Sequence, residues 1–183
     1  PSNAFLLVVG DGPVRGELEK LAGSLGIGER IRFTGVVDRD KVPQHAAAFD
    51  IALQPAVTAY ASPLKMMEYL VLGKAIVAPR APNICEILSD GGNAALFDEA
   101  VPGSLEATLT RICKDDAFRC RLGAAALAGA QKYEPLSDSV RAALSRSIAD
   151  QAPPQTSFRN PLEAADWLTG PRLTVCIMVV HPD

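Results

Sequence analysis

Short apolar runs alternate along the chain with segments in which apolar residues recur every three or four positions. The runs predict β-strands at residues 5–9, 31–34, 51–53, 75–78 and 93–97. The periodic segments predict helices at residues 14–25, 41–49, 63–72, 84–88, 104–113, 117–132 and 137–149. Strands that alternate with helices are typical of a parallel sheet covered on both faces. We therefore predict an α/β fold with a Rossmann-like, doubly wound parallel sheet.

Turn-forming residues follow the predicted strands. They form loops at residues 10–13, 35–38, 54–62 and 79–83. Doubly wound sheets bind their ligands at the carboxyl ends of the strands. We therefore expect a functional site among these loops.

The last part of the chain departs from this alternation. Residues 151–156 (QAPPQT) are typical of a linker, a short helix begins at Asn160 and Pro161 and runs to Trp167, and residues 173–180 (LTVCIMVV) are strongly apolar. We divide the chain into a Rossmann-like domain over residues 1–150 and a C-terminal appendage over residues 151–183. The apolar run either joins an edge of the sheet or opens a further, truncated domain, and we favour the second. Left unpaired it would expose a hydrophobic edge, so pairing with a second copy in a homodimer is a further expectation.

Composition and charge narrow the class of protein. With 48% hydrophobic and 21% charged residues, the chain has ample material for a core, which argues against disorder. The formal net charge of -3 gives no electrostatic case for nucleic-acid binding. No apolar run reaches the roughly 18–20 residues of a membrane span.

Because Pro1 is not an initiator methionine, we expect a piece of a longer protein. The cysteines lack C-x-x-C spacing, which favours free thiols in a reducing compartment over a zinc site.

The turn after the first predicted strand matches a dinucleotide-binding fingerprint only in part. Gly10 and Gly12 stand at the first two glycine positions of G-x-G-x-x-G, but Arg15 stands at the third. No acidic residue follows a second strand at the expected distance. We therefore interpret the turn as a Gly-Pro corner that begins a helix, and we do not favour a dinucleotide-dependent oxidoreductase.

The helix predicted before Gly73 offers the best candidate chemistry. Ser62 can cap this helix and Pro63 suits its first position. Its N-terminus would present unpaired N–H groups that suit a phosphate, and Lys65 adds a positive charge. One turn deeper, the Glu68 carboxylate can accept hydrogen bonds from two adjacent hydroxyls, as on a ribose. The spacing alone leaves this site and a plain Lys65–Glu68 surface pair equally open.

The order of motifs decides between these alternatives. G-D-G-P follows the first strand, then come R-I-R-F-T-G-V-V, S-P-L-K-x-x-E-Y-x-x-x-G-K and A-P-N-I-C-E-I-L-S-D-G-G-N-A-A-L-F. This ensemble resembles the retaining family 4 glycosyltransferases, which have the GT-B architecture of two Rossmann-like domains. The resemblance covers residues 5–132. It implies the C-terminal half of such an enzyme, which binds the nucleotide-sugar donor.

The resemblance also implies roles for individual residues. Glu68 would bind the donor ribose, the start of the helix and Lys65 would meet the diphosphate, and the loop after the second strand would lie against the nucleobase. The donor-binding positions that match the family are Gly10, Gly12, Gly35, Val36, Val37, Tyr60, Ala61, Ser62, Pro63, Leu64, Lys65 and Glu68. Tyr60 departs from the family pattern, which often has a glutamate there that touches the donor sugar. Glu86 matches an acidic residue of the family, and we expect its role to be structural.

These implications define the expected function. The chain would be the donor-binding half of a glycosyltransferase that takes a sugar from a nucleotide-diphosphate sugar with retention of configuration. Its partners would be this donor and an N-terminal acceptor-binding domain, so the fragment alone would be inactive, and no catalytic residue is assigned to it. We expect no metal or other cofactor, because we assign no Asp-x-Asp metal motif to the chain. The resemblance implies a place in the cytoplasm or at the inner face of the membrane. Tyr60 and the C-terminal segment leave one alternative open, a non-catalytic GT-B-like scaffold or docking module of a multidomain protein.

Overall fold

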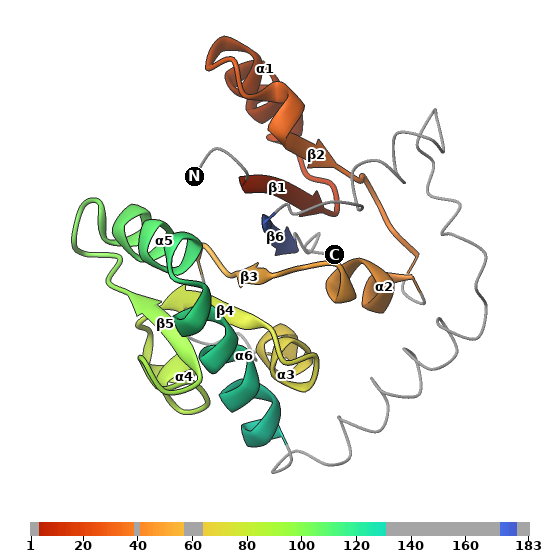
Figure 1. Ribbon diagram of the computed structural model, residues 1–183. Coiled ribbons are helices and arrows are strands. Elements are labelled where there is room, and N and C mark those ends of the chain that lie inside the picture. Colours follow the sequence, from red (N-terminus) through yellow and green to blue (C-terminus); the bar gives the residue numbers. More distant parts are fainter. Residues whose placement is uncertain (1–3, 39–40, 57–63, 131–172, 179–183) are drawn as a thin grey trace.

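The computed structural model describes residues 4–38, 41–56, 64–130 and 173–178 (Figure 1). The strands are β1 (Ala4–Val9), β2 (Ile31–Phe33), β3 (Ile51–Leu53), β4 (Ala75–Pro79), β5 (Ala94–Phe97) and β6 (Leu173–Met178). The helices are α1 (Arg15–Ser24), α2 (Val42–Ala47), α3 (Leu64–Val71), α4 (Pro82–Cys85), α5 (Ser104–Lys114) and α6 (Asp116–Ala130), with a 3-10 turn η1 (Gly28–Arg30).

The strands form one sheet in the order β2-β1-β6-β3-β4-β5, and every described strand pair is parallel. The chain steps from β1 to β2 through α1, and in the opposite direction from β3 to β4 and β5 through α3 and α4. Right-handed crossovers that step in opposite directions place their helices on opposite faces of the sheet. The predicted α/β class and doubly wound parallel sheet are therefore confirmed.

The position of β6 corrects the expectations for the C-terminal run. β6 lies in the middle of the sheet, where Val175 is in register with Leu6 of β1 on one side and with Ile51 of β3 on the other. It therefore does not extend an edge, because it is a central member of the same sheet as β1 and β3. Since both its neighbours belong to the same chain, this strand offers no free edge for a homodimer. An apolar, β-branched run suits such a place, because strands inside a parallel sheet are covered on both faces.

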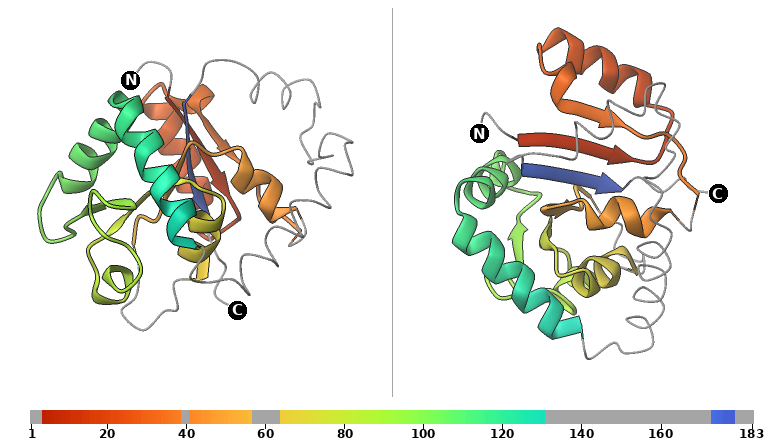
Figure 2. Two further views of the ribbon diagram at one scale, coloured as in Figure 1. Left: turned by 60° about the horizontal axis from the view of Figure 1, so that its bottom comes forward. Right: turned by 45° about the vertical axis from the view of Figure 1, so that its right-hand side comes forward.

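Two apolar layers hold the sheet to its helices. On one face, Leu7 of β1 and Ile76 of β4 belong to a buried cluster with Tyr69 and Leu70 of α3. On the other, the buried strand residues pack with residues of α5 and α6, among them Ile112, Phe118 and Leu122. β3, β4 and β5 are buried along their whole length, as their continuous apolar runs predict. Figure 2 shows α1 at the β2 end of the sheet and α5 and α6 over the other.

Two glycines allow α3 and α6 to approach each other closely. Gly73 ends α3 with a φ of +61°, which confirms the predicted exit residue. A Cβ atom added to Gly123 of α6 would lie 2.5 Å from the carbonyl oxygen of Gly73. Next to this contact, Lys74 Nζ donates a hydrogen bond of 2.7 Å to the Phe49 carbonyl, beyond the end of α2. Burial lowers the pKa of Lys74. The turn before β4 is thus packed against two other elements.

A few sequence-based boundaries differ from the structure or lie beyond it. The fourth helix begins at Pro82 instead of Ile84, because proline suits the first turn of a helix. The predicted helices at residues 137–149 and 160–167 and the linker at 151–156 lie outside the described residues. Cys85, Cys113 and Cys120 are free thiols. Within the described ranges, no helix is long and apolar enough to cross a membrane.

Candidate functional site

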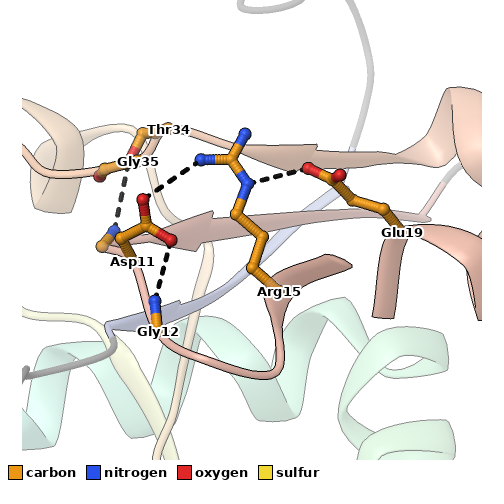
Figure 3. A network of polar contacts seen from close by, with 7 residues as sticks. Asp11, Gly12, Arg15, Glu19, Thr34 and Gly35 are labelled. Atoms are coloured by element: carbon orange, nitrogen blue, oxygen red, sulfur yellow. Dashed lines mark hydrogen bonds and ion pairs between the residues drawn. The ribbon is translucent and has the colours of Figure 1, made fainter. Parts of the chain in front are cut away.

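Two glycine turns meet at the carboxyl ends of β1 and β2. Gly10, directly after β1, has a φ of +123° and bridges Gly35, which has a φ of +70°. The Gly10 N–H donates a hydrogen bond of 3.1 Å to Thr34 Oγ1, and this hydroxyl donates in turn to the Gly35 carbonyl at 2.9 Å (Figure 3). Both glycines hold backbone conformations that other residues rarely adopt. The two loops therefore form one connected platform.

Arg15 lies beside this platform and carries a network of ion pairs (Figure 3). Its Nε donates to Glu19 Oε1 at 2.8 Å, and its Nη1 lies 3.6 Å from Asp11 Oδ2. The hydrogen bond with Glu19 raises the pKa of Arg15. The guanidinium also lies 5.8 Å from the centre of the Phe33 ring. A Cβ atom at Gly35 would lie 3.2 Å from Arg15 Nη1, so the guanidinium would have to shift by a few tenths of an ångström, and the φ of +70° already disfavours other residues there.

The residues after Gly35 present one apolar side chain to solvent and one to the core. Val36 is 82% exposed, whereas Val37 packs against the buried cluster on the α3 face. Gly12 keeps its N–H in a hydrogen bond of 2.8 Å to Asp11 Oδ1. The loop therefore offers backbone groups and one exposed valine at the carboxyl edge of the sheet.

The helix α3 divides into a buried side and a half-exposed side. Met66, Tyr69 and Leu70 are at most 1% exposed, because residues three and four apart share one side of a helix. Lys65 and Glu68 lie partly exposed on the other side, three residues apart. The predicted helix is confirmed, and Leu64 is its first residue. Tyr60, Ala61, Ser62 and Pro63 lie outside the described residues, and with them the expected helix cap.

The topology brings the glycine turns after β1 and β2 and the loop after β3 to one edge of the sheet. β1, β2 and β3 are parallel members of one sheet, so Gly10, Gly35 and Gln54 follow their strands at the same edge. The connection from β3 to α3 begins at this edge, and α3 starts where that connection ends. The direction of the chain reverses between β1 and β3, which is where doubly wound sheets bind ligands.

The expectation of no metal does not account for one acidic motif near this edge. Asp38-Arg39-Asp40 is an Asp-x-Asp sequence after β2. Asp38 is 73% exposed in its side chain and pairs with Lys41 at 3.2 Å, while Asp40 is not described. Across the parts of the chain that are described, no three His, Cys, Asp or Glu side chains gather in a way that could hold a metal ion.

Sequence patterns missed most of the Arg15 network. Asp11, Arg15 and Glu19 follow one another at intervals of four, a spacing that favours ion pairs along a helix. This spacing could have predicted the network, whereas the comparison with the dinucleotide fingerprint notes only that Arg15 stands at the third glycine position. The role of Thr34 had no local signal, because its partner Gly10 is 24 residues away.

Glu86, for which we expect a structural role, directly follows α4, and its side chain is exposed.

Comparison with known proteins places this fold among glycosyltransferases. The 2-deoxystreptamine glucosyltransferase of Streptomyces kanamyceticus is 28% identical over 111 residues, which are 61% of this chain and 28% of that protein. The structure of HepE from Anabaena in complex with UDP matches 80% of this chain and 42% of its own, with a TM-score of 0.65 and 22% identity. The C-terminal domain of LpcC from Francisella tularensis, a glycosyl transferase group 1 family protein, matches 70% of this chain and 85% of its own, with a TM-score of 0.60 and 16% identity.

These matches define which part of a glycosyltransferase the chain represents. The chain spans less than half of the glucosyltransferase and of HepE, but most of the isolated LpcC domain. Its fold is that of the C-terminal domain in GT-B glycosyltransferases. The family model described as glycosyl transferases group 1 matches residues 1–128. The chain therefore belongs to the family of glycosyl transferases group 1.

Proposed function

We propose that this domain binds the nucleotide-diphosphate sugar donor of a glycosyltransferase. The observation that carries the proposal is the meeting of three features at one edge of the sheet, namely the glycine turns after β1 and β2 and the start of the β3–α3 crossover. The fold supports this placement, because doubly wound sheets take nucleotides at the edge where the chain reverses. HepE, which shares the fold, was solved with UDP.

The start of α3 would receive the diphosphate. Backbone N–H groups at a helix N-terminus attract anions, and Lys65 in the first turn adds a full positive charge. Tyr60, Ala61, Ser62, Pro63 and Leu64 would complete this part of the site, through the loop that leads into the helix. The negative charge that develops on the leaving diphosphate would be stabilised there.

Glu68 would hold the ribose one turn deeper than the diphosphate. A carboxylate has two oxygens that can accept hydrogen bonds from both ribose hydroxyls. Glu68 and Lys65 lie on the same half-exposed side of α3. This arrangement fits a ligand that runs along the helix from phosphate to ribose. The two groups would therefore act on neighbouring parts of one ligand.

The platform at Gly10 and Gly35 would hold the nucleobase. The exposed side chain of Val36 can pack against the flat face of a base, while the backbone of Gly35 and Val37 offers polar groups at its edge. Gly10 and Gly12 allow the chain to pass close to the donor. Arg15 would act as a positioning residue, because its ion pairs lie behind Gly35 and do not depend on a ligand.

The whole protein would transfer the sugar with retention of configuration, as in family 4, without a metal cofactor. Acceptor binding would come from an N-terminal domain, so the isolated domain would bind donor without turning it over. The free thiols Cys85, Cys113 and Cys120 support a reducing compartment such as the cytoplasm. A location at the inner face of the membrane belongs to the same proposal.

Nucleotide titration of the chain tests this proposal. UDP, GDP and ADP are titrated separately by calorimetry, and one of them is expected to bind at or below millimolar concentration. Glu68→Gln should weaken that binding at least about tenfold, because hydrogen bonds to a charged group are worth about 1.5–3 kcal/mol. Glu106→Gln on the exposed surface of α5 is the matched control and should bind like the unaltered chain. Failure of all three nucleotides to bind, or equal affinity in Glu68→Gln, would contradict the proposal.

A further inference from the structure

β6 is the one strand that joins the two halves of the sheet in the described structure. β1 pairs with β2 and β6, and β3 pairs with β4 and β6, while no described ladder links β1 to β3 directly. Along β1, the register with β6 runs from Ala4 opposite Leu173 to Val9 opposite Met178. Without this strand, β1 and β3 would each present an open edge to the other.

The position of β6 does not match its place in the sequence. Doubly wound sheets commonly have the strand order 3-2-1-4-5-6. The observed order β2-β1-β6-β3-β4-β5 becomes this order when β6 is counted as the first strand. The last described strand of the chain therefore occupies the position of a first strand, at the point where the sheet changes direction.

An independent observation on α1 marks the same position. In a doubly wound sheet, a right-handed crossover helix links positions one and two and lies beside the helix that links positions two and three. The second of these helices is α1, but β6 follows β1 in the chain, so no crossover runs from β6 to β1. Accordingly α1 has an uncovered apolar stripe, with Val14, Leu18, Leu21 and Leu25 between 43% and 62% exposed. Among the described elements, no helix links β6 to β1 on this side of α1.

The two halves that β6 joins carry different parts of the proposed donor site. The half made of β1, α1 and β2 holds the platform of Gly10 and Gly35. The half made of β3, α3, β4 and β5 holds Lys65 and Glu68. A donor that contacts both halves therefore requires a fixed distance between β1 and β3. The one strand that lies between them sets this distance.

We propose that the space between β1 and β3 is an acceptor site for one parallel, apolar strand, that β6 fills it from within the chain, and that its insertion and donor binding stabilise each other. This inference rests on the proposed donor site. Strand addition supplies backbone hydrogen bonds on both sides of the inserted segment. Because a ligand that binds only the assembled form stabilises that form, the coupling must act equally in both directions.

The first test is amide hydrogen exchange on the full chain. Residues 173–178 should exchange slowly, and more slowly still with the nucleotide that binds best. Val175→Pro removes a backbone donor in the middle of β6 and cannot be accommodated in a central strand. It should speed exchange in β1 and β3 and weaken nucleotide binding at least tenfold, whereas Val175→Ile, which keeps the backbone donor and an apolar β-branched side chain, should do neither.

The second test separates insertion from general misfolding. A synthetic peptide of residues 171–183 (PRLTVCIMVVHPD) is added to the Val175→Pro chain. It should restore slow exchange in β1 and β3 together with nucleotide affinity, while the same peptide carrying Val175→Pro should restore neither. Rescue by the first peptide alone would establish the acceptor site.

Three outcomes would overturn the inference. They are exchange of residues 173–178 at the rate of an unstructured peptide, full nucleotide affinity in Val175→Pro, or no rescue by the unaltered peptide. If the chain binds no nucleotide but the peptide still restores slow exchange, the proposed function and the coupling fail while the acceptor site stands.

Discussion

The backbone N–H of Gly10 lies 3.1 Å from the hydroxyl of Thr34, so the chain at the end of β1 is fixed to the chain at the end of β2. The two residues are 24 positions apart and half-buried. The Thr34 N–H bonds in turn to the Val8 carbonyl at 3.0 Å. The shape of the platform in the candidate site therefore depends on one hydroxyl group.

Replacing Thr34 by valine keeps the size of the side chain but removes that hydroxyl. The Gly10 N–H would lose its acceptor, and an unpaired, partly buried donor costs about 1–3 kcal/mol. We expect Thr34→Val to lower the free energy of unfolding in urea within this range. Thr34→Ser keeps the hydroxyl and should retain most of the stability. Equal unfolding midpoints for the valine variant and the unaltered chain would show that the bond does not matter.

Gly123→Ala should destabilise the chain through the contact between α3 and α6. The added methyl group would lie 2.5 Å from the Gly73 carbonyl oxygen, so the backbone must move. Overpacking of this kind costs about 1–3 kcal/mol. Gly23→Ala on α1, where nothing lies within 4 Å, is the matched control. It should raise stability by about 0.5–1 kcal/mol, since alanine favours a helix. A thermal melt of both variants distinguishes the two effects, and equal shifts would contradict the close contact.

Asp90 should make stability depend on pH in the acid range. Partial burial acts to raise its pKa, but the Leu96 N–H and the Arg80 guanidinium together outweigh this, so the pKa of Asp90 is lowered. A group whose pKa is lower when folded contributes stability above its unfolded pKa and loses it as the pH falls toward the folded value. The difference in unfolding free energy between the unaltered chain and Asp90→Asn should therefore shrink below about pH 4. A difference that stays constant from neutral to acid pH would contradict this prediction.

The apolar stripe on α1 should tolerate charge. Leu18 and Leu21 are 43% and 52% exposed, so glutamate at either position should change the free energy of unfolding by no more than about 0.5 kcal/mol. Ala22, on the same helix, is only 4% exposed, and Ala22→Glu should cost about 2 kcal/mol or more. A large loss of stability in Leu21→Glu would mean that this side of α1 is covered.

Local patterns predicted the elements well because strands buried on both faces leave continuous apolar runs, as in β4, and surface helices leave periodic ones, as in α5. The half-exposed side of α3 was also predictable, since Lys65 and Glu68 are its polar residues in an apolar segment. The order of strands was not, because an apolar run shows that a strand is buried but not which strands flank it. The apolar run at Leu173 therefore predicts a strand but not its place in the sheet. The contact of Thr34 with Gly10 is not predictable either, because the two residues are 24 positions apart.

The strand in the middle of the sheet is also the last of the described strands to leave the ribosome. A nascent chain that has reached Ala130 already contains five of the six strands, but β1 and β3 still lack a shared neighbour. Until residues 173–178 emerge, the edges of β1 and β3 that face each other lack the strand that pairs with them in the described structure. Synthesis at about 5–20 residues per second leaves this intermediate exposed for several seconds. Production of the protein should therefore respond to slower translation and to chaperones that cover strand edges.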